Sequence, residues 1–423
     1  MLRILFFAAA SFLIASVAQA VATPYGKEFI KLQSPEFDLS PIVRHVKKIR
    51  ESTDRLVVDS MNDLPCLASS DLSPYASELI EYHQRKGLSY LKRDEKLHAL
   101  SCFLSALHLV RVNEGLYSEN QKSIIRNVQS IYYLQKDFKS LAKAYEYLFQ
   151  LNGGEKPPFD SLKLEFILEY LEWRRDLIKL NFAAKKEDLL DLYDLNKRFI
   201  DEVTSDKALS QEWHVLLSMS QLANLYLILN GFTPVSKDKE IIFRNDFNNI
   251  ESPHGQSKLQ RLMALADDGA SIGRRLLERS LLSPDLNATD RLLLLVGLGD
   301  WFQWLKRSVT ASNYYRQAYQ LSLASTDAGA ANLFNIPKEL PDSSVFFDRF
   351  SSKENKIADI ISVDFEVLKT GKISNLEVKG IDLLGTRKSK RIFRKLKNTR
   401  FRPQFRDGKP VDAVIKNRNY KVF

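Results

Sequence analysis

The residue types that carry chemistry are sparse and scattered in this chain. Its six histidines stand far apart, and the sequence contains no His-Glu-x-x-His, no Gly-x-Ser-x-Gly, no glycine-rich phosphate loop and no Cys-x-x-Cys pair. These patterns are typical of metalloproteases, serine hydrolases, nucleotide-binding enzymes and zinc or redox proteins. Without them, we expect a non-enzymatic protein that holds no cofactor and no metal.

The densest group of carboxylates lies in LLDLYDLNKRFIDEV, residues 189–203, which carries Asp191, Asp194, Asp201 and Glu202. Enzymes that hydrolyse polysaccharides use two carboxyl groups held across the bond that they cleave. An envelope hydrolase with a ring-shaped helical body is therefore one alternative. The spacing of these residues fits the solvated face of an ordinary helix better than a paired acid and base.

The first twenty residues, MLRILFFAAASFLIASVAQA, have the composition of an export signal. Arg3 precedes an apolar run over residues 4–17, and Ala18-Gln19-Ala20 follows as a small-residue cleavage site. An uncleaved membrane anchor is the alternative, but the run is shorter than the roughly 20 residues that span a bilayer. We expect cleavage after Ala20, a periplasmic location, and no transmembrane segment in the mature chain.

Two cysteines occur, Cys66 and Cys102. An even pair in an exported chain is typical of a disulfide, and a bond that closes a loop of this size stabilises a fold by about 3–4 kcal/mol in the chain-entropy model. His98 precedes Cys102 by four residues, on one face of a helix, which raises a metal site as the alternative. Because no third ligand lies nearby, we favour the disulfide.

Length and charge suggest more than one domain. The chain of 423 residues is long enough for two or three domains. Between Lys353 and Phe423 there are 19 Lys and Arg against 8 Asp and Glu, so the net charge of +10 comes from this segment and the rest is close to neutral. We expect the C-terminal segment to meet an acidic partner or surface.

A proline-containing lead-in with a short helix is expected over residues 21–73, and helical spacing of apolar residues then continues for about 250 residues. YLKRDEKLHALSCF, which starts at Tyr90, aligns with YLQKDFKSLAKAYE, which starts at Tyr133, at a step of 43 residues. A period of this length is typical of stacked helix pairs. A weaker match to this repeat begins at Gly299-Asp300-Trp301, where we expect a helix to start. A helical-repeat domain is therefore predicted over residues 74–345.

Small residues at the helix crossings explain such a repeat. Two antiparallel helices approach closely only where a small side chain lies between them, and Ala99, Ala106, Ala142 and Ala144 are candidates for these positions. The pattern resembles the tetratricopeptide repeat family in a longer-helix form. That resemblance implies a solenoid whose concave face binds a protein partner.

The apolar period changes from helical to alternating near Asn355, so a second domain is predicted over residues 356–423. Its expected order is strand, hairpin turn, strand, basic helix, turn, and a closing strand or a pair of short ones. These are placed at residues 361–367, Gly371, 376–378, 386–398, 407–408 and 411–422.

FRPQFRDGKPV, residues 401–411, connects the helix to the closing strand. Phe401 would anchor the end of the helix in the sheet, and Pro403 would prevent the helix from continuing. Asp407-Gly408 would turn the chain, because glycine adopts positive φ without strain. Val411 is then expected to enter the sheet again.

The order and spacing of VDFEVLKTGKISNLEVKG and NTRFRPQFRDGKPVDAVI resemble the TonB C-terminal domain family, over about 65 residues. The resemblance implies a small α+β domain in the periplasm of a Gram-negative bacterium. In the energy transducers of that family, this domain pairs edge to edge with a segment of an outer-membrane transporter, which is strand addition. Those transducers also need an uncleaved anchor and a long proline-rich spacer, and a helical body stands here in place of the spacer. We therefore expect an accessory role rather than force transduction.

Together these patterns predict a mainly α protein, an α-helical tetratricopeptide-like solenoid followed by a small α+β TonB-like domain. We expect a non-enzymatic periplasmic adaptor of a TonB-type envelope transport system, and its partner would be a periplasmic or outer-membrane protein. Anionic cell-wall polymer or acidic lipid headgroups are alternative partners of the basic tail. Nucleic acid is excluded by the export signal and by the lack of an aromatic stacking platform.

The residues expected to contact a partner belong to the C-terminal segment. Four are basic side chains expected to be exposed, and three belong to a candidate edge strand. They are Arg400, Arg402, Arg406 and Lys409, followed by Val411, Ala413 and Ile415.

Overall fold

The structure is a computed structural model of the chain, and it is mainly helical with a small C-terminal sheet region. The residues that it describes are 32–33, 73, 75–180, 187–206, 209–232, 253–324, 330, 332–341, 359–379 and 386–422. The predicted signal peptide, most of the lead-in and Cys66 lie outside these residues.

The chain divides into two compact units at a different place from the predicted boundary. One unit comprises Met1–Phe37, Leu295–Phe347 and Glu354–Phe423, and the other comprises Asp38–Leu294 and Asp348–Lys353. The C-terminal residues therefore form a unit with the last part of the predicted helical-repeat domain. We call them the sheet unit and the helical unit.

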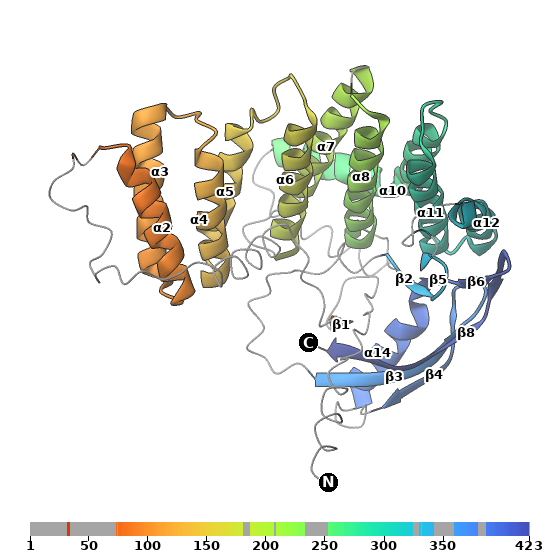
Figure 1. Ribbon diagram of the computed structural model, residues 1–423. Coiled ribbons are helices and arrows are strands. Elements are labelled where there is room, and N and C mark those ends of the chain that lie inside the picture. Colours follow the sequence, from red (N-terminus) through yellow and green to blue (C-terminus); the bar gives the residue numbers. More distant parts are fainter. Residues whose placement is uncertain are drawn as a thin grey trace, which may run out of the picture. The chain divides into compact units, whose positions relative to one another are not determined.

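The helical unit contains α helices that follow one another along the chain, and from α2 to α8 each helix packs against the next (Figure 1). Their bounds are α2 Glu78–Lys92, α3 Lys96–Glu114, α4 Gln121–Gln135, α5 Phe138–Leu151, α6 Ser161–Leu180, α7 Glu187–Ser205, α8 Gln211–Phe232 and α10 Pro253–Leu281. Helix α11, Ala288–Trp304, begins in this unit and ends in the sheet unit, where α12, Ser308–Ala324, follows it. Gly299-Asp300-Trp301 thus lies inside α11, and the expectation that it opens a helix is wrong.

Three helix pairs share one tight turn. A residue with positive φ, which is Asp94, Lys136 or Lys306, ends the first helix of α2/α3, α4/α5 and α11/α12. In each turn the next backbone N–H donates to the carbonyl five residues earlier, at 2.9, 2.9 and 2.8 Å, as in the Schellman motif. The acceptors are the carbonyls of Tyr90, Tyr132 and Phe302.

This turn corrects the predicted repeat. Because Tyr90 and Tyr132 occupy the same place relative to it, the structural step between the first two pairs is 42 residues, and the predicted step of 43 is wrong by one. Ala99 is buried at the crossing as expected, but its equivalent at this step is the buried Leu141. Ala142 is only partly buried.

A glycine packs against an aromatic ring where α2 crosses α3 and where α11 crosses α12. A Cβ built on Gly87 would lie 3.0 Å from the ring of Phe103, and one on Gly299 would lie 2.3 Å from the ring of Tyr315. Both rings are buried, and each follows its glycine by sixteen residues. The missing side chain is therefore what lets the second helix of each pair approach the first.

The sheet unit has an antiparallel sheet in the order β1-β8-β3-β4, and two smaller sheets pair β2 with β5 and β6 with β7. The bounds are β1 Leu32–Gln33, β2 Lys338–Leu340, β3 Asp359–Val367, β4 Ile373–Lys379, β5 Arg400–Arg402, β6 Gln404–Arg406, β7 Lys409–Val411 and β8 Ala413–Val422. Helix α14, Thr386–Asn398, lies between β4 and β5 along the chain (Figure 1).

The core of the sheet unit confirms the predicted alternation. Ile361, Val363, Phe365 and Val367 point from β3 to one face and are buried, together with Ile392 and Leu396 of α14 and with Phe401. Since successive residues of a strand point to opposite faces, the residues between them are left on the other side of the sheet. Helix α14 thus covers one face only.

The two predicted turns occur where expected, but the second connects the strands of a small hairpin and does not return the chain to the main sheet. Gly371 has a φ of 71° between β3 and β4, and Asp407 and Gly408 have φ values of 50° and 73° between β6 and β7. Val411 pairs with Gln404 in the small β6–β7 hairpin. The prediction that Val411 enters the main sheet is wrong, because a two-residue turn places the residues on either side of it opposite one another.

Candidate functional site

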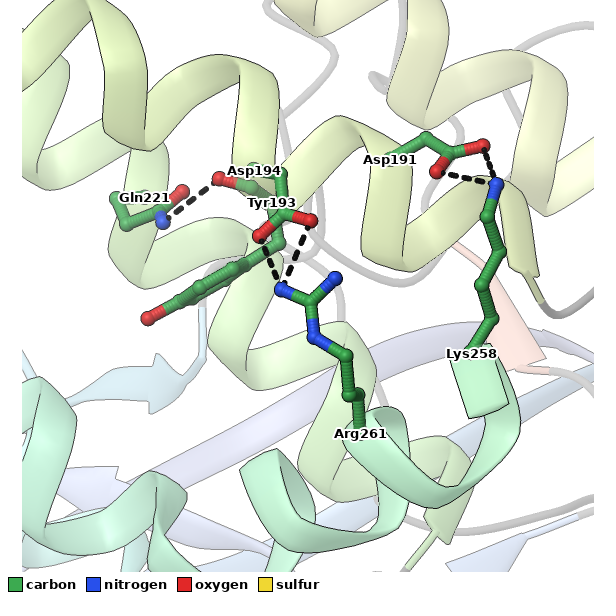
Figure 2. A network of polar contacts seen from close by, with 6 residues as sticks. All are labelled: Asp191, Tyr193, Asp194, Gln221, Lys258 and Arg261. Carbon is green, nitrogen blue, oxygen red and sulfur yellow. Dashed lines mark hydrogen bonds and ion pairs between the residues drawn. The ribbon is translucent and has the colours of Figure 1, made fainter. Parts of the chain in front are cut away.

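The carboxylates considered for a hydrolase take part in a row of ion pairs (Figure 2). Both oxygens of Asp191 accept from the Lys258 ammonium, at 2.8 and 2.9 Å. Both oxygens of Asp194 accept from the Arg261 guanidinium, at 3.1 and 3.2 Å. The acids lie three residues apart on α7 and the cations three apart on α10, so the two pairs tie one turn of each helix together.

This row places the carboxylates beside cations and not beside each other as an acid and a base. Asp201 and Glu202 are exposed further along α7. Among the residues that the structure describes, no group of three His, Cys, Asp or Glu could hold a metal ion. His98 is exposed and contacts Glu95 at 3.1 Å, whereas Cys102 is buried in the core of α2, α3 and α4.

Replacing Asp191 and Asp194 by Asn should lower the free energy of unfolding of the helical unit by about 0.5–1 kcal/mol, because partly exposed ion pairs contribute little. Urea unfolding would measure this. The matched control, Asp201→Asn with Glu202→Gln, removes the same charge from exposed positions and should change stability less. We expect no turnover of cell-wall fragments by the wild type or by either variant, and a wild-type turnover that the first variant abolished would instead support the hydrolase.

A largely buried ion pair of the sheet unit joins Arg402 to Asp300. The Arg402 Nε and Nη2 atoms donate to the two Asp300 carboxylate oxygens at 2.9 and 2.6 Å, and the Tyr315 hydroxyl donates to the same carboxylate at 2.9 Å. Burial disfavours the charge of the guanidinium, but the Asp300 carboxylate outweighs it and raises the pKa of Arg402. A third donor, Nη1, reaches the carbonyl of Leu333 at 3.2 Å.

The expectation that Arg402 is an exposed docking residue is therefore wrong. Its side chain is 3% exposed and serves as the ionic connection between β5 and α11. Phe405 follows Arg402 by three residues and lies on β6. It is buried among the rings of Tyr315, Tyr319 and Phe334, with ring centroids 5.1–6.0 Å away. The segment that begins with Phe401 thus fastens the sheet to the α11/α12 pair.

The other predicted docking residues lie nearer the surface. Arg406 and Lys409 are exposed on the β6–β7 hairpin, at either side of its turn. Arg400 is partly buried and donates to the carbonyls of Asn398 and Thr399. Val411, Ala413 and Ile415 are partly buried as well.

Strand β8 has one paired side and one largely open side. It pairs with β3 from Ala413 to Val422, while β1 pairs only with Lys421 and Val422 on the other side. Within the part of the chain that the structure describes, residues 413–420 have no strand on that outer side. Val414, 67% exposed, points away from the covered face. Backbone groups at such an edge are available to another strand.

The open edge is bounded by an irregularity of the strand. Asn417 has a φ of 53°, and its N–H donates to the Asp364 carboxylate at 2.6 Å, where the β3–β8 register shifts. Lys379 pairs with the same carboxylate at 2.6 Å. The hydrogen bond from Lys379, followed by that from Asn417, lowers the pKa of Asp364. Before this irregularity, the residues of β8 in regular register with β3 run from Ala413 to Ile415.

Two acids that pair with buried arginines of the C-terminal segment were not predicted from the sequence. Asp300 and Glu339 pair with Arg402 and Arg418, and the second pair is 3.3 Å apart with both side chains buried. The one feature of the sequence that could have indicated the first acid is its position: Asp300 follows Gly299, the glycine at a helix crossing. The second acid lies in a short strand that the apolar pattern does not reveal.

None of the helices in the described residues is both long and apolar enough to cross a membrane. No family model matches the chain, and no curated protein matches it.

Proposed function

We propose that this protein is a non-enzymatic interaction protein of the bacterial periplasm, and that the outer edge of β8 receives an extended, acidic segment of a periplasmic or outer-membrane partner. The observation that carries this proposal is the open edge over residues 413–416. Added strands gain affinity from backbone hydrogen bonds and selectivity from alternate side chains. The resemblance to the TonB C-terminal domain supports the same mode and an accessory role in envelope transport.

Charge supports the choice of an acidic segment. Arg406, Lys409 and Lys416 are exposed around the beginning of β8. No ion pair joins them to another described residue, whereas Arg402 pairs with Asp300 and Arg418 with Glu339. Such cations speed association with an acidic partner and favour it over others.

The helical unit supplies a second surface in this proposal. The α2/α3 and α4/α5 pairs share a turn and bury Phe103 and Tyr145 at equivalent positions, which supports a repeated helix pair of the tetratricopeptide kind. Helix pairs of this kind bind proteins through side chains spread over several helices, so no single motif marks their site. A disulfide between Cys66 and Cys102 would tie the lead-in to the first pair.

A photo-crosslinking amino acid at Val414 should capture a discrete partner in the intact envelope. The same amino acid at Ser362 is the matched control, since Ser362 pairs with Lys379 of β4 on one side and with Asn419 of β8 on the other. The double variant Arg406→Glu with Lys409→Glu should reduce capture at Val414 at least tenfold, because it replaces attraction by repulsion. Equal capture at both positions, or none at Val414, would overturn the proposal.

A further inference from the structure

Helix α14 presents a face of cations that no acid of the helix balances. Its sequence, TRKSKRIFRKLKN, has seven Lys and Arg and no Asp or Glu. Ile392 and Leu396 are buried against the sheet. Lys390, Arg394 and Lys397 are exposed at spacings of four and three residues, so they lie in a row on the side away from the core.

These three cations have no hydrogen-bond or ion-pair partner among the described residues. No hydrogen bond or ion pair joins Lys390, Arg394 or Lys397 to another described residue. Other cations of the C-terminal segment serve the fold, such as Arg402 with Asp300 at 2.6 Å. A row of unpaired charges on one helix adds repulsion within the protein, which an anionic surface would remove.

An exposed aromatic ring lies beside this row. Phe393 is 40% exposed, and it stands three residues after Lys390 and four before Lys397, so the two cations flank it on the helix surface. A polyanion alone would neutralise the cations and leave this ring in water. A bilayer interface offers anionic headgroups and, just below them, an apolar layer that accepts the ring.

We propose that the exposed face of α14 binds the surface of an anionic phospholipid bilayer, with Lys390, Arg394 and Lys397 against the headgroup phosphates and Phe393 inserted beneath them. The face is separate from the β8 edge in sequence and in residues, so membrane contact and partner docking are independent. A protein held at a bilayer in this way would meet membrane partners by diffusion in two dimensions.

Sedimentation of the full chain with vesicles tests this proposal. The chain should bind vesicles of phosphatidylcholine with 30 mol% phosphatidylglycerol and should not bind pure phosphatidylcholine. Lys390→Gln with Arg394→Gln and Lys397→Gln should weaken the partition by about a hundredfold, since each cation near an anionic surface contributes about a factor of five. Phe393→Ala should weaken it several-fold.

The matched control removes three exposed cations of the helical unit, through Lys139→Gln, Lys143→Gln and Lys197→Gln. It has the same net charge as the α14 variant and should bind like the wild type. Equal binding of the wild type and the α14 variant, or equal binding to neutral vesicles, would overturn the proposal. So would binding that Phe393→Ala leaves unchanged and that purified sacculi compete for, because the partner would then be a polyanion and not a bilayer.

Discussion

Replacing Asp300 by Asn should destabilise the sheet unit by about 3 kcal/mol. The substitution leaves the Arg402 guanidinium buried without its charge partner, and the loss of one member of a buried pair typically costs about 3–5 kcal/mol. Hydrogen exchange of the full chain would measure the effect, as faster exchange of the β3 and β8 amides. The helical unit should exchange as in the wild type.

Two further variants separate the charge from its surroundings. Asp300→Leu with Arg402→Met replaces the pair by apolar side chains and should restore most of the lost stability, since buried pairs contribute little over well-packed apolar groups. Tyr315→Phe removes only the hydroxyl that donates to Asp300 and should cost about 1 kcal/mol. An Asp300→Asn variant as stable as the wild type would show that Arg402 is not held as described.

Replacing Gly371 by Ala should have an effect of similar size, about 3–4 kcal/mol, for a different reason. The φ of 71° is unfavourable for any residue with a side chain. In addition, a Cβ at this position would lie 1.8 Å from the Gln303 Nε2 atom and 2.1 Å from the carbonyl oxygen of Phe401. Because the carbonyl belongs to the backbone, it cannot move aside, and overpacking of this kind costs about 1–3 kcal/mol.

Gly408 provides a matched control for Gly371. Its φ of 73° is nearly the same, but the nearest atom to an added Cβ is in the Tyr319 ring, 4.0 Å away. Gly408→Ala should therefore cost only the backbone strain, about 1–2 kcal/mol. Unfolding in urea, followed through hydrogen exchange of β3, would compare the two. Equal losses would contradict the close packing of Gln303 and Phe401 around Gly371.

Local pattern was enough to predict β3, β4, α14 and two turns of the sheet unit. The alternation from Ile361 to Val367 and the helical spacing of Ile392 and Leu396 each report burial on one face, and burial is what the structure shows. The turns at Gly371 and Gly408 follow from the conformational freedom of glycine. These features depend on residues close together in the sequence.

Contacts between residues that are far apart in the sequence could not be predicted from this local pattern. Arg402 and Arg406 have similar neighbours in the sequence, yet Arg402 is buried and Arg406 is exposed. The difference comes from Asp300, 102 residues before Arg402, which pairs with Arg402. The repeat step was misjudged because Tyr132 and Tyr133 adjoin, so a tyrosine aligns with Tyr90 at either step. The turn hydrogen bond to the Tyr132 carbonyl decides between them, and apolar spacing does not encode it.

The candidate site was predicted in part. The β6–β7 hairpin with exposed Arg406 and Lys409 and the strand that begins at Ala413 lie close to the expected segment. The division into units was not foreseen, because the α11/α12 pair has ordinary helical spacing and its attachment to Phe405 and Arg402 is tertiary. Asp300 could be recognised only with the fold in hand.

Hydrogen exchange of β8 with and without the partner captured at Val414 tests the central claim most directly. The account predicts slower exchange of the amides from Ala413 to Lys416 in the complex, with β4 unchanged, because an added strand hydrogen-bonds the outer edge of β8 alone. Exchange in β8 that the partner leaves unchanged, or protection confined to the helical unit, would contradict strand addition at this edge.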